Sequence, residues 1–391
     1  MDHSCRLPWT WLVINVEQNT WRFCCKSPWQ VDFSNGYHPA LNGYLVDVKD
    51  SFRRGDRPEA CSVCWREEDA GGASYRTNVT GATTRDRLPS HDGIGFIDII
   101  FGSVCNLRCA SCGPMSSSQW RSLLAKNDNP YEFLAVKSGV PDKRAWDRIP
   151  ELIRDNINSL SHINIYGGEP SIDQDFIEMM DRVCEADLSS RRNRPIEMRI
   201  YTNGVWPERD ILSQRFLTNM NRARSVGWKV DVKFSIDAVG EHAHFVRHPT
   251  DWTLLDRNLD MMVREGLTER IHITSSLLNL PIQHEILEYM LDKPWRDQIT
   301  PVANLVNRPP ILSVANLGPR IEEFFTGWKD LPDLPTWRNY RIWIDNLINT
   351  QQNGMVDDAM LKRFEGYVDW YASVNNTTIP PKLAAAYSRY L

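Results

Sequence analysis

Phe96-Ile-Asp-Ile-Ile-Phe101 and Cys105-Asn-Leu-Arg-Cys109-Ala-Ser-Cys112 form the stretch that decides this fold. The first part is an apolar run of strand length, and the second places three cysteines at intervals of four and three. A strand ending in such a loop can direct three thiolates toward one centre. Structural zinc sites close with four ligands, and most [4Fe–4S] clusters also take four cysteines. Three cysteines therefore indicate a cluster that keeps one iron open, and a zinc loop completed by a distant Cys or His is the alternative.

The composition predicts a cytoplasmic protein of more than one domain. The chain has 391 residues and a net charge of -5, and this length predicts about two or three structural units. Charges of mixed sign give no general nucleic-acid footprint. The cluster Arg191-Arg192-Asn-Arg194 is typical of a solvated turn, with phosphate binding as the alternative. No secretory signal is visible at Met1, and no apolar run approaches the ~20 residues that span a bilayer. We expect neither a membrane nor a nucleic-acid partner.

The N-terminal 80 residues carry most of the other cysteines. Residues 9–16 and 20–23 are aromatic-rich runs that predict a β-hairpin, in which Asn19 can supply the positive φ of the turn. Nine cysteines in a reducing compartment favour metal or redox chemistry over disulfides. The hairpin and a later CxxC knuckle can bring together four thiolates: Cys5, either Cys24 or Cys25, Cys61 and Cys64. Zinc fits this set as well as an iron–sulfur cluster does.

From residue 94 to about 307 the pattern repeats strand, loop and helix. The predicted strands are 96–101, 161–166, 196–202, 229–236, 270–276 and 300–306. Such alternation indicates a parallel sheet, and about six units make an incomplete version of the eight-unit barrel. We therefore predict an α/β fold: a partial (β/α)6 TIM-like barrel at 94–315, preceded by a cysteine-rich β-hairpin module at 1–80 and followed by a helical segment at 316–391.

The middle strands alternate between apolar and polar residues. In a curved barrel the apolar face would meet the helices and the polar face the lumen; an antiparallel sheet with one wet face is the alternative. The polar set is Asn164, Tyr166, Arg199, Tyr201, Asp231, Lys233, Ser235, Asp237, His272 and Thr274. A polar lumen suits a polar ligand. After residue 316, apolar stripes at helical spacing predict helices that pack on the barrel.

Polar motifs follow three of these strands at the ends where α/β folds bind ligands. They are Tyr166-Gly-Gly-Glu169-Pro170, Thr202-Asn203-Gly204 and Ser235-Ile-Asp237. The paired glycines let a backbone approach a ligand closely, and Glu169 can accept from an ammonium group. Ser235 and Asp237 share one strand face, where they can meet hydroxyl groups or a carboxylate. Together the motifs predict a ligand site beside the cysteine loop.

Cys105-xxx-Cys109-xx-Cys112 followed by Gly167-Gly-Glu-Pro170 resembles the radical S-adenosylmethionine (radical SAM) superfamily, over residues 94 to about 307. The resemblance implies a [4Fe–4S] cluster whose open iron binds the amino and carboxylate groups of SAM. Reductive cleavage then gives a 5′-deoxyadenosyl radical that abstracts hydrogen from the substrate.

By this resemblance the three loop cysteines are cluster ligands and Glu169 holds the SAM ammonium. The remaining implied cofactor-binding residues are Gly167, Gly168, Pro170, Thr202, Asn203, Ser235, Asp237 and Arg247. For Arg247, a carboxylate partner, a surface salt bridge is the alternative.

Ser111 departs from the family, which usually places an aromatic residue just before the third cysteine. The adenine contacts are therefore expected elsewhere, at Asn279 and Val306. Two further groups of residues have plainer interpretations. Cys184 shares a helical face with apolar residues, which predicts a buried packing cysteine. A catalytic hydrogen donor is the alternative. We expect His242, His244 and His248 to lie on a solvated helix. Metal binding by these histidines is the alternative.

The N-terminal module resembles the auxiliary-cluster domain of the twitch/SPASM group, although in the best-known members that domain follows the barrel. Asn19 also stands where a glycine is usual. Four cysteines imply one auxiliary cluster, of the [4Fe–4S] type, that accepts or relays an electron. The resemblance implies peptide or protein substrates and a flavodoxin- or ferredoxin-type electron donor. The expected reaction is a cross-link, epimerisation or backbone rearrangement. The alternatives are dehydrogenation of a small polar alcohol such as an aminocyclitol or sugar and, outside enzymes, a zinc-stabilised binding module.

Overall fold

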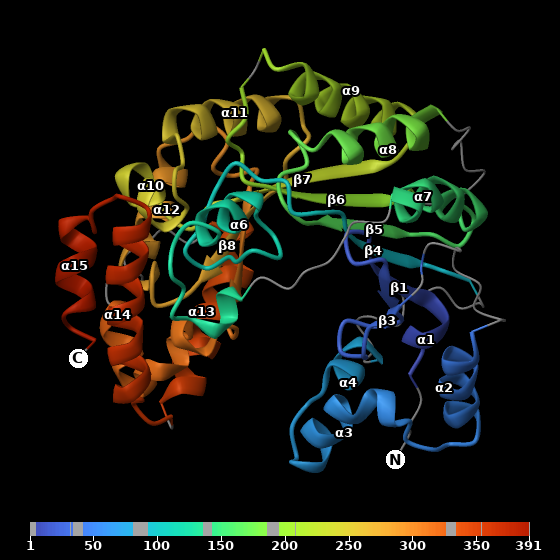
Figure 1. The fold of residues 1–391 in the computed structure, drawn as a ribbon, viewed down its shortest axis with the longest axis horizontal. Helices are drawn as coiled ribbons and strands as arrows, with labels where there is room; N and C mark the ends of the chain where they lie inside the picture. Colours follow the sequence, from blue (N-terminus) through green and yellow to red (C-terminus); the bar gives the residue numbers. More distant parts are fainter. Residues whose placement is uncertain are drawn as a thin grey trace. The chain divides into compact units, whose positions relative to one another are not determined.

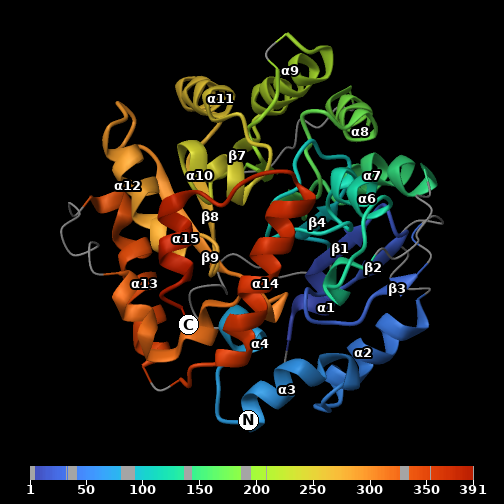
Figure 2. The same cartoon turned by 60° about the vertical axis from the view of Figure 1, so that its left-hand side comes forward.

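The computed structural model describes residues 5–31, 33, 42–80, 93–135, 143–185, 195–207, 209–325, 334–352 and 354–390. The basic cluster at 191–194 lies outside these residues. The chain divides into two compact units: unit 1 is Met1–Gly102, Ser138–Ile200 and Arg215–Val230, and unit 2 is Ser103–Lys137, Tyr201–Gln214 and Asp231–Leu391. Figures 1 and 2 show the ribbon from two directions.

Unit 1 contains the N-terminal cysteines and the first strands of the parallel sheet. Its strands are β1 Trp11–Asn15, β2 Thr20–Arg22, β3 Gln30–Val31, β4 Phe96–Ile100, β5 His162–Tyr166 and the start of β6 Glu197–Thr202. Its helices are α1 Leu7–Thr10, α2 Gly43–Arg53, α3 Ser62–Asp69, α4 Tyr75–Thr80, α7 Lys143–Asp155, α8 Gln174–Glu185 and the end of α9 Ile211–Ser225, with a 3-10 turn at Glu59–Cys61.

The strand order in unit 1 is β3-β2-β1-β4-β5-β6. β1 pairs antiparallel with β2, and β4, β5 and β6 pair in parallel. β1 also pairs in parallel with β4, with Val13 opposite Asp98. The predicted hairpin is confirmed, including the positive φ of 51° at Asn19. Its first strand begins two residues later and ends one residue earlier than predicted. The later start arises because a short helix, with Pro8 in its first turn, takes up Trp9 and Thr10.

Unit 2 continues with parallel strands and ends in helices. Its strands are β7 Lys229–Ser235, of which the first two residues belong to unit 1, β8 Arg270–Ser275 and β9 Thr300–Leu305. β7 pairs with β8 and β8 with β9, all in parallel. The helices are α6 Ser118–Leu124, α10 Gly240–Val246, α11 Trp252–Arg264, α12 Gln283–Leu291, α13 Arg338–Gln351, α14 Asp358–Val374 and α15 Pro381–Tyr387. The 3-10 segments are Glu132–Leu134, Leu280–Ile282, Pro310–Leu312, Val314–Phe324 and Pro335–Trp337.

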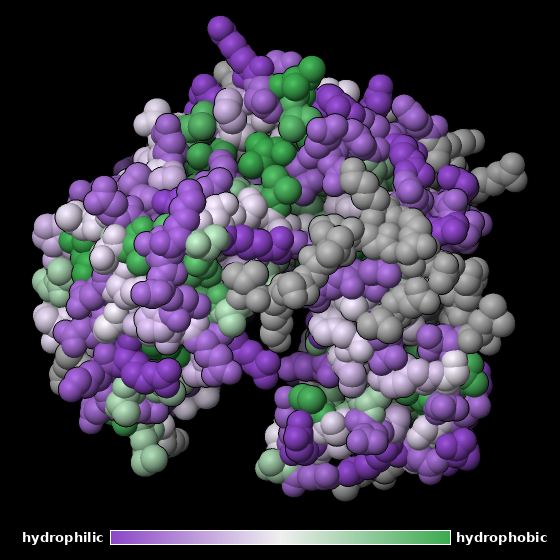
Figure 3. Space-filling view, in the orientation of Figure 1, coloured by the Kyte–Doolittle hydropathy of each residue, from purple (hydrophilic) through white to green (hydrophobic). Residues whose placement is uncertain are grey.

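Each unit has its own apolar core. In unit 1, Ile97 and Ile99 of β4 and Ile163 and Ile165 of β5 are buried. Helices α7 and α8 lie side by side near these strands (Figures 1 and 2). In unit 2, α14 and α15 lie side by side, with the rings of Phe364 and Tyr387 5.2 Å apart. Hydrophilic residues predominate on the face drawn in Figure 3, with hydrophobic ones scattered among them.

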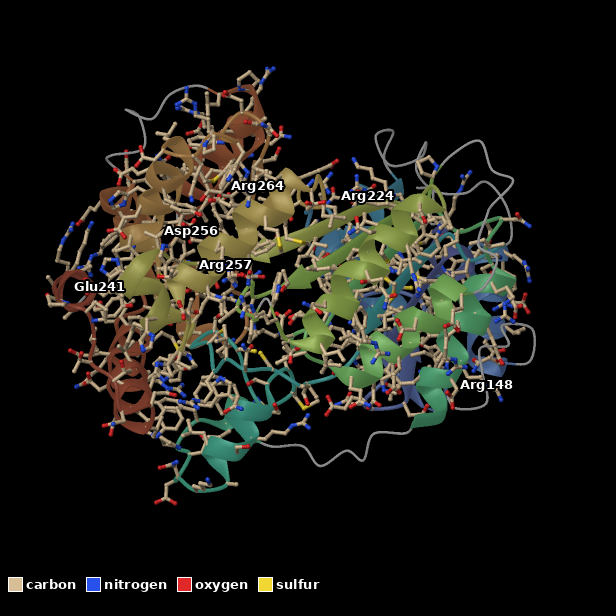
Figure 4. All side chains as sticks on the ribbon, turned by 90° about the horizontal axis from the view of Figure 1, so that it is seen from above. Arg148, Arg224, Glu241, Asp256, Arg257 and Arg264 are labelled. Carbon is tan, nitrogen blue, oxygen red and sulfur yellow. The ribbon has the colours of Figure 1, made fainter. Side chains whose placement is uncertain are left out.

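The outer helices carry exposed charges. Figure 4 labels five exposed examples, Arg148 of α7, Arg224 of α9, Glu241 of α10, and Arg257 and Arg264 of α11. Among the described residues, no helix is long and apolar enough to cross a bilayer.

The predicted α/β class with mostly parallel strands is confirmed. All six predicted strands form, and each ends within one residue of its predicted bounds. Closure into a partial (β/α)6 barrel stays a prediction, and so does the functional division at 1–80, 94–315 and 316–391. Most residues of the predicted C-terminal stripes are buried, including Tyr340, Ile344, Phe364 and Tyr371, whereas Ile348 and Met360 are half-buried.

Candidate functional site

The cysteine loop of unit 2 is tied to the segment that ends α10. The backbone N–H of Arg108 donates to the carbonyl of His248 at 2.5 Å, and that of Ala110 donates to the carbonyl of Val246 at 2.9 Å. Cys109, between them, is 7 % exposed, while Cys105 and Cys112 are half-buried residues. The loop therefore has a defined backbone path around its central cysteine.

Arg247 and Asp237 form a buried ion pair beside these thiols. Arg247 Nη1 lies 2.7 Å from Asp237 Oδ2, and the two side chains are 12 % and 2 % exposed. Asp237 Oδ1 also accepts from the backbone N–H of Thr274 at 2.7 Å. The alternative of a surface salt bridge for Arg247 is therefore wrong, because the pair is almost wholly removed from water.

The thiols and this ion pair influence each other electrostatically. Burial raises the pKa of the Cys109 thiol to about 12, although the Arg247 charge acts in the opposite direction. Burial raises the pKa of Cys112 as well. Burial opposes the charge on Arg247, but Cys109 and Asp237 outweigh it and raise its pKa. A bound metal would keep such thiols deprotonated, so the sulfur donors and the nearby cation suit an anionic iron–sulfur centre.

Two predicted residues, Thr202 and Asn203, stand at the end of β6, and Asn203 lies next to the first cysteine. Asn203 Nδ2 donates to Asn106 Oδ1 at 2.8 Å and lies 3.8 Å from Cys105 Sγ. Thr202 is buried and accepts from the backbone N–H of Gly204 at 3.1 Å through Oγ1. Asn203 is therefore placed to orient the cysteine loop, whereas the Thr202 hydroxyl supports the turn that follows β6.

The end of β7 brings Ser235 and Asp237 to the same region of unit 2. Ser235 is half-buried and stands opposite His272 of β8 in the register. Asn279, one of the expected adenine contacts, is buried and donates to the backbone carbonyl of Asp237 at 2.8 Å. Val306, the other, is buried just after β9. Asn279 thus supports the strand end, and adenine contact by either residue stays a prediction.

The Gly-Gly-Glu-Pro turn belongs to unit 1. Gly167 has a φ of 147°, and a Cβ there would lie 2.8 Å from Phe101 Cδ1 and 2.9 Å from the carbonyl of Gly102. Gly168 donates its backbone N–H to that same carbonyl at 2.9 Å. The lack of a side chain at Gly167 therefore allows this turn to pack against the end of β4. Pro170 is buried in the same turn.

Glu169 of this turn is wholly buried. Its Oε1 accepts from the backbone N–H and the hydroxyl of Ser171, at 3.1 and 2.7 Å. The turn thus fixes the direction of a buried carboxylate, as a group that accepts from an ammonium requires.

A cavity in unit 1 joins the four N-terminal thiols. Its lining contains Cys5, Cys24, Cys61 and Cys64. Burial raises the pKa of Cys5 to about 11 and that of Cys61 to about 12. Four sulfur donors fit either an iron–sulfur cluster or zinc. The hairpin and the knuckle therefore converge as the sequence predicts, even though they are more than thirty residues apart in the chain.

Cys25 does not line this cavity. A hydrogen bond with Cys24 is the main cause that lowers its pKa, and Arg22 contributes in the same direction. The same hydrogen bond and burial raise the pKa of Cys24. Of the two neighbouring cysteines, the structure places Cys24 with the other three thiols.

Arg76 is a feature of the cavity wall that sequence patterns do not indicate. It is 6 % exposed, lines the cavity and pairs with Glu68 at 2.6 Å. Its guanidinium carbon lies 4.7 Å from the ring centroid of Trp65. A lone arginine in the short helix α4 gives no motif, so its position at the cavity follows only from the tertiary structure.

The structure supports the packing interpretation of Cys184 but not the solvated helix predicted for all three histidines. Cys184 is half-buried, and its Sγ lies 3.6 Å from the carbonyl of Asn219, as expected for a packing cysteine. The solvated helix expected for the three histidines is wrong for two of them: His242 and His248 are 8 % and 7 % exposed, and only His244 is exposed. His242 Nδ1 lies 2.8 Å from Glu285 Oε2, which accounts for its burial. Among the described residues, no group of three or more His, Cys, Asp and Glu side chains is already set at metal-binding distances.

Residues 99–290, just under half of the chain, match the family described as the Radical SAM superfamily. Over these residues the chain is similar to radical SAM domains. The matched stretch contains the three-cysteine loop, the Gly-Gly-Glu-Pro turn, Asp237 and Arg247. The radical SAM superfamily implies a [4Fe–4S] cluster and SAM, and the three sulfur donors of the loop near Arg247 fit that cluster.

Similarity to known proteins beyond this domain is distant. None of the curated proteins matches the chain. The solved structure of native anSMEcpe with bound AdoMet aligns with a TM-score of 0.42 and 15% identity, over 66% of this chain and 62% of that one. Streptococcus suis SuiB bound to precursor peptide SuiA aligns with a TM-score of 0.36 and 15% identity, over 69% and 59%. The chain thus spans about three fifths of the length of each, and likeness this distant carries no argument about substrate.

Proposed function

We propose that this chain is a radical SAM enzyme whose active-site cluster is held by Cys105, Cys109 and Cys112. With that cluster and SAM bound, reductive cleavage would supply a 5′-deoxyadenosyl radical for hydrogen abstraction. The observation that carries the proposal is the position of the three cysteines on one loop of a radical SAM domain, beside the buried Arg247–Asp237 pair. Three sulfur ligands leave one iron for an outside ligand.

Several residues of this chain would prepare the site for SAM. Arg247 contributes a buried positive charge near the thiolates, and Asp237 fixes the direction of its guanidinium. Asn203 orients the loop through Asn106 and Cys105. By their motifs, Thr202, Ser235 and the turn from Gly167 to Pro170 contribute to SAM binding, with Glu169 accepting from the ammonium group.

We further propose that Cys5, Cys24, Cys61 and Cys64 hold one auxiliary [4Fe–4S] cluster. Their convergence on one cavity supports this assignment over a scattered set of free thiols. Four cysteine ligands close such a cluster, so its expected role is to accept or relay an electron. A flavodoxin- or ferredoxin-type protein is the proposed electron donor.

The favoured substrate is a peptide or protein, modified by a cross-link, an epimerisation or a backbone rearrangement. The support is the resemblance of the N-terminal cysteine pattern to the twitch/SPASM group, together with the cavity that collects those cysteines.

Dehydrogenation of a small polar alcohol is the second candidate, favoured by polar side chains on the strands of unit 2. Lys233 Nζ lies 3.4 Å from Tyr201 Oη, and His272 Nε2 lies 2.7 Å from Asn304 Nδ2. Burial lowers the pKa of His272 to about 4, so this ring is neutral near pH 7. Such groups suit hydroxyl recognition. Asp231 on the same face is already engaged by Arg270 at 3.1 Å.

Anaerobic reconstitution tests the class of protein. We expect about eight irons per chain, and 5′-deoxyadenosine formed from SAM when a reductant is added. Cys109→Ala should abolish SAM cleavage, whereas Cys61→Ala should spare it. Zinc uptake without SAM cleavage would instead support a zinc-stabilised binding module and overturn the enzyme assignment.

The neighbouring cysteines test the auxiliary site. Cys24→Ala should lower the iron content from about eight to about four per chain, because it removes a sulfur that lines the cavity. Cys25→Ala is the matched control and should keep the full iron content. Equal iron loss in the two variants contradicts the assignment of Cys24. Candidate peptides and cyclitols can then be compared in assays of the loaded enzyme, with 5′-deoxyadenosine formation as the readout.

A further inference from the structure

Helix α14 reaches the cysteine loop through two tyrosine hydroxyls. Tyr367 donates to the carbonyl of Ala110 at 2.5 Å, and Tyr371 donates to the carbonyl of Arg108 at 2.7 Å. The two tyrosines are four residues apart and so lie on one face of the helix, and both are 0 % exposed. Their acceptors stand on either side of Cys109.

Asn375 adds a third link directly after α14. Its Oδ1 accepts from Arg108 Nε at 2.7 Å, and its Nδ2 donates to the carbonyl of Tyr371 at 2.9 Å. Asn375 is 6 % exposed. The same helix end therefore holds both the backbone and the side chain of Arg108.

Three further backbone groups around Cys109 are engaged within unit 2. The N–H groups of Arg108 and Ala110 donate to the segment after α10, and the carbonyl of Cys109 accepts from Trp120 Nε1 at 3.0 Å. Hydrogen bonds in several directions leave this backbone little freedom to rotate, so the direction of the Cys109 side chain is fixed. The hydroxyls of α14 supply two of these bonds from a part of the chain more than 250 residues away.

An aromatic cluster surrounds this contact. Tyr367 packs against Tyr131 with ring centroids 5.0 Å apart and against Phe133 at 5.5 Å. Tyr371 packs against Trp120 at 5.8 Å. These rings surround the two tyrosines that bind the loop. The loop itself has no aromatic residue, because Ser111 stands where the family usually has one. The cluster keeps water from competing for the two tyrosine bonds.

We propose that Tyr367 and Tyr371 are positioning residues for the active-site cluster, and that helix α14 is part of the cluster-binding machinery. This inference rests on the proposed function, because it takes Cys109 as a cluster ligand. Each hydroxyl fixes one carbonyl beside Cys109, and without them the loop can turn its central thiol away from the position that the iron requires. The C-terminal helices are thereby assigned more than packing.

Tyr→Phe exchanges in the full chain test the proposal. Tyr367→Phe and Tyr371→Phe each remove one hydroxyl and keep the ring. Tyr390→Phe is the matched control, because Tyr390 is equally buried and donates to the carbonyl of Leu277 at 2.9 Å, outside the loop. After anaerobic reconstitution, we expect both loop variants to lose iron to a chelator about fivefold faster than the parent chain or more. The control should match the parent.

Two readouts separate positioning from general stability. We expect the electron paramagnetic resonance spectrum of the reduced cluster, with and without SAM, to change in Tyr367→Phe and Tyr371→Phe but not in Tyr390→Phe. All three variants should lower the unfolding temperature by a similar amount. In the iron-free chain, alkylation of Cys109 should be faster in the two loop variants only. Unchanged spectra and alkylation rates, or equal changes in the control, would overturn the proposal. A parent chain that binds no cluster overturns the proposed function itself.

Discussion

Replacing Arg247 by methionine removes one half of a buried ion pair and keeps an unbranched side chain of similar length. The carboxylate of Asp237 would stay in a site where it is 2 % exposed. Its Oδ1 would keep the hydrogen bond from Thr274, but Oδ2 would lose the guanidinium that lies 2.7 Å away. The variant therefore leaves the Asp237 carboxylate buried with the Thr274 hydrogen bond but without the positive charge that paired with it.

Breaking a buried pair from one side costs about 3–5 kcal/mol, since the remaining charge is left without its partner. One hydrogen bond survives, so we expect a loss of about 3 kcal/mol in the free energy of unfolding. Arg296→Met is the control: Arg296 and Asp297 lie 3.8 Å apart with side chains 54 % and 68 % exposed. A pair so exposed to water is worth about 0–1 kcal/mol at most.

Urea denaturation of the iron-free parent chain, Arg247→Met, Asp237→Asn and the double variant measures this cost. A shift of the midpoint at constant slope reports the change in stability. The double variant should be less destabilised than the sum of the single variants by about 1 kcal/mol or more, because neither charge is then left alone. A loss below about 1 kcal/mol in Arg247→Met, or strict additivity, would refute the argument.

Two further predictions concern unit 1. Burial raises the pKa of Asp98 from 3.8 to about 6, so the folded chain holds this proton more tightly than the unfolded chain, and stability should fall as the pH rises from about 4 to about 6. Urea midpoints measured across this pH range should fall less in Asp98→Asn than in the parent chain. An equal fall in the two proteins contradicts a raised pKa at Asp98. Gly167→Ala should cost about 1–3 kcal/mol, because its new Cβ meets Phe101 at 2.8 Å. Gly227→Ala is the control, because Gly227 has a φ of 90° and an added Cβ there meets no atom, so its cost reports backbone strain alone. An equal loss of stability in the two variants would refute the clash at Gly167.

The strands of the parallel sheet could be predicted because their apolar residues alternate and their ends carry turn residues. β5 and β6 show this alternation directly in their burial. The pairing of β1 with β4 could not be predicted, since the two strands are separated by 80 residues and periodicity does not encode a partner. For the same reason the sequence suggests a separate hairpin module, whereas the hairpin shares a sheet with β4.

The candidate sites show the same limit. The cysteines, Asp237 and Arg247 are visible in the sequence, because metal ligands and strand-end motifs have characteristic spacing. The helical stripe that contains Tyr367 and Tyr371 correctly predicts burial, but nothing in that stripe indicates that the hydroxyls meet the loop at Arg108 and Ala110. Hydrogen-bond partners of buried tyrosines depend on packing between distant segments.

The parallel pairing of β1 with β4 also protects the sheet from self-association. Without the hairpin, β4 would present a row of unpaired backbone groups along a strand whose Ile97 and Ile99 are wholly buried in the folded chain. Exposed apolar edges of this kind recruit strands from other molecules. The hairpin covers that edge, and within the described part of the chain the outermost strand is β3, with two residues. A chain shortened to residues 93–391 should therefore aggregate even though all three cysteines of the 105–112 loop are present.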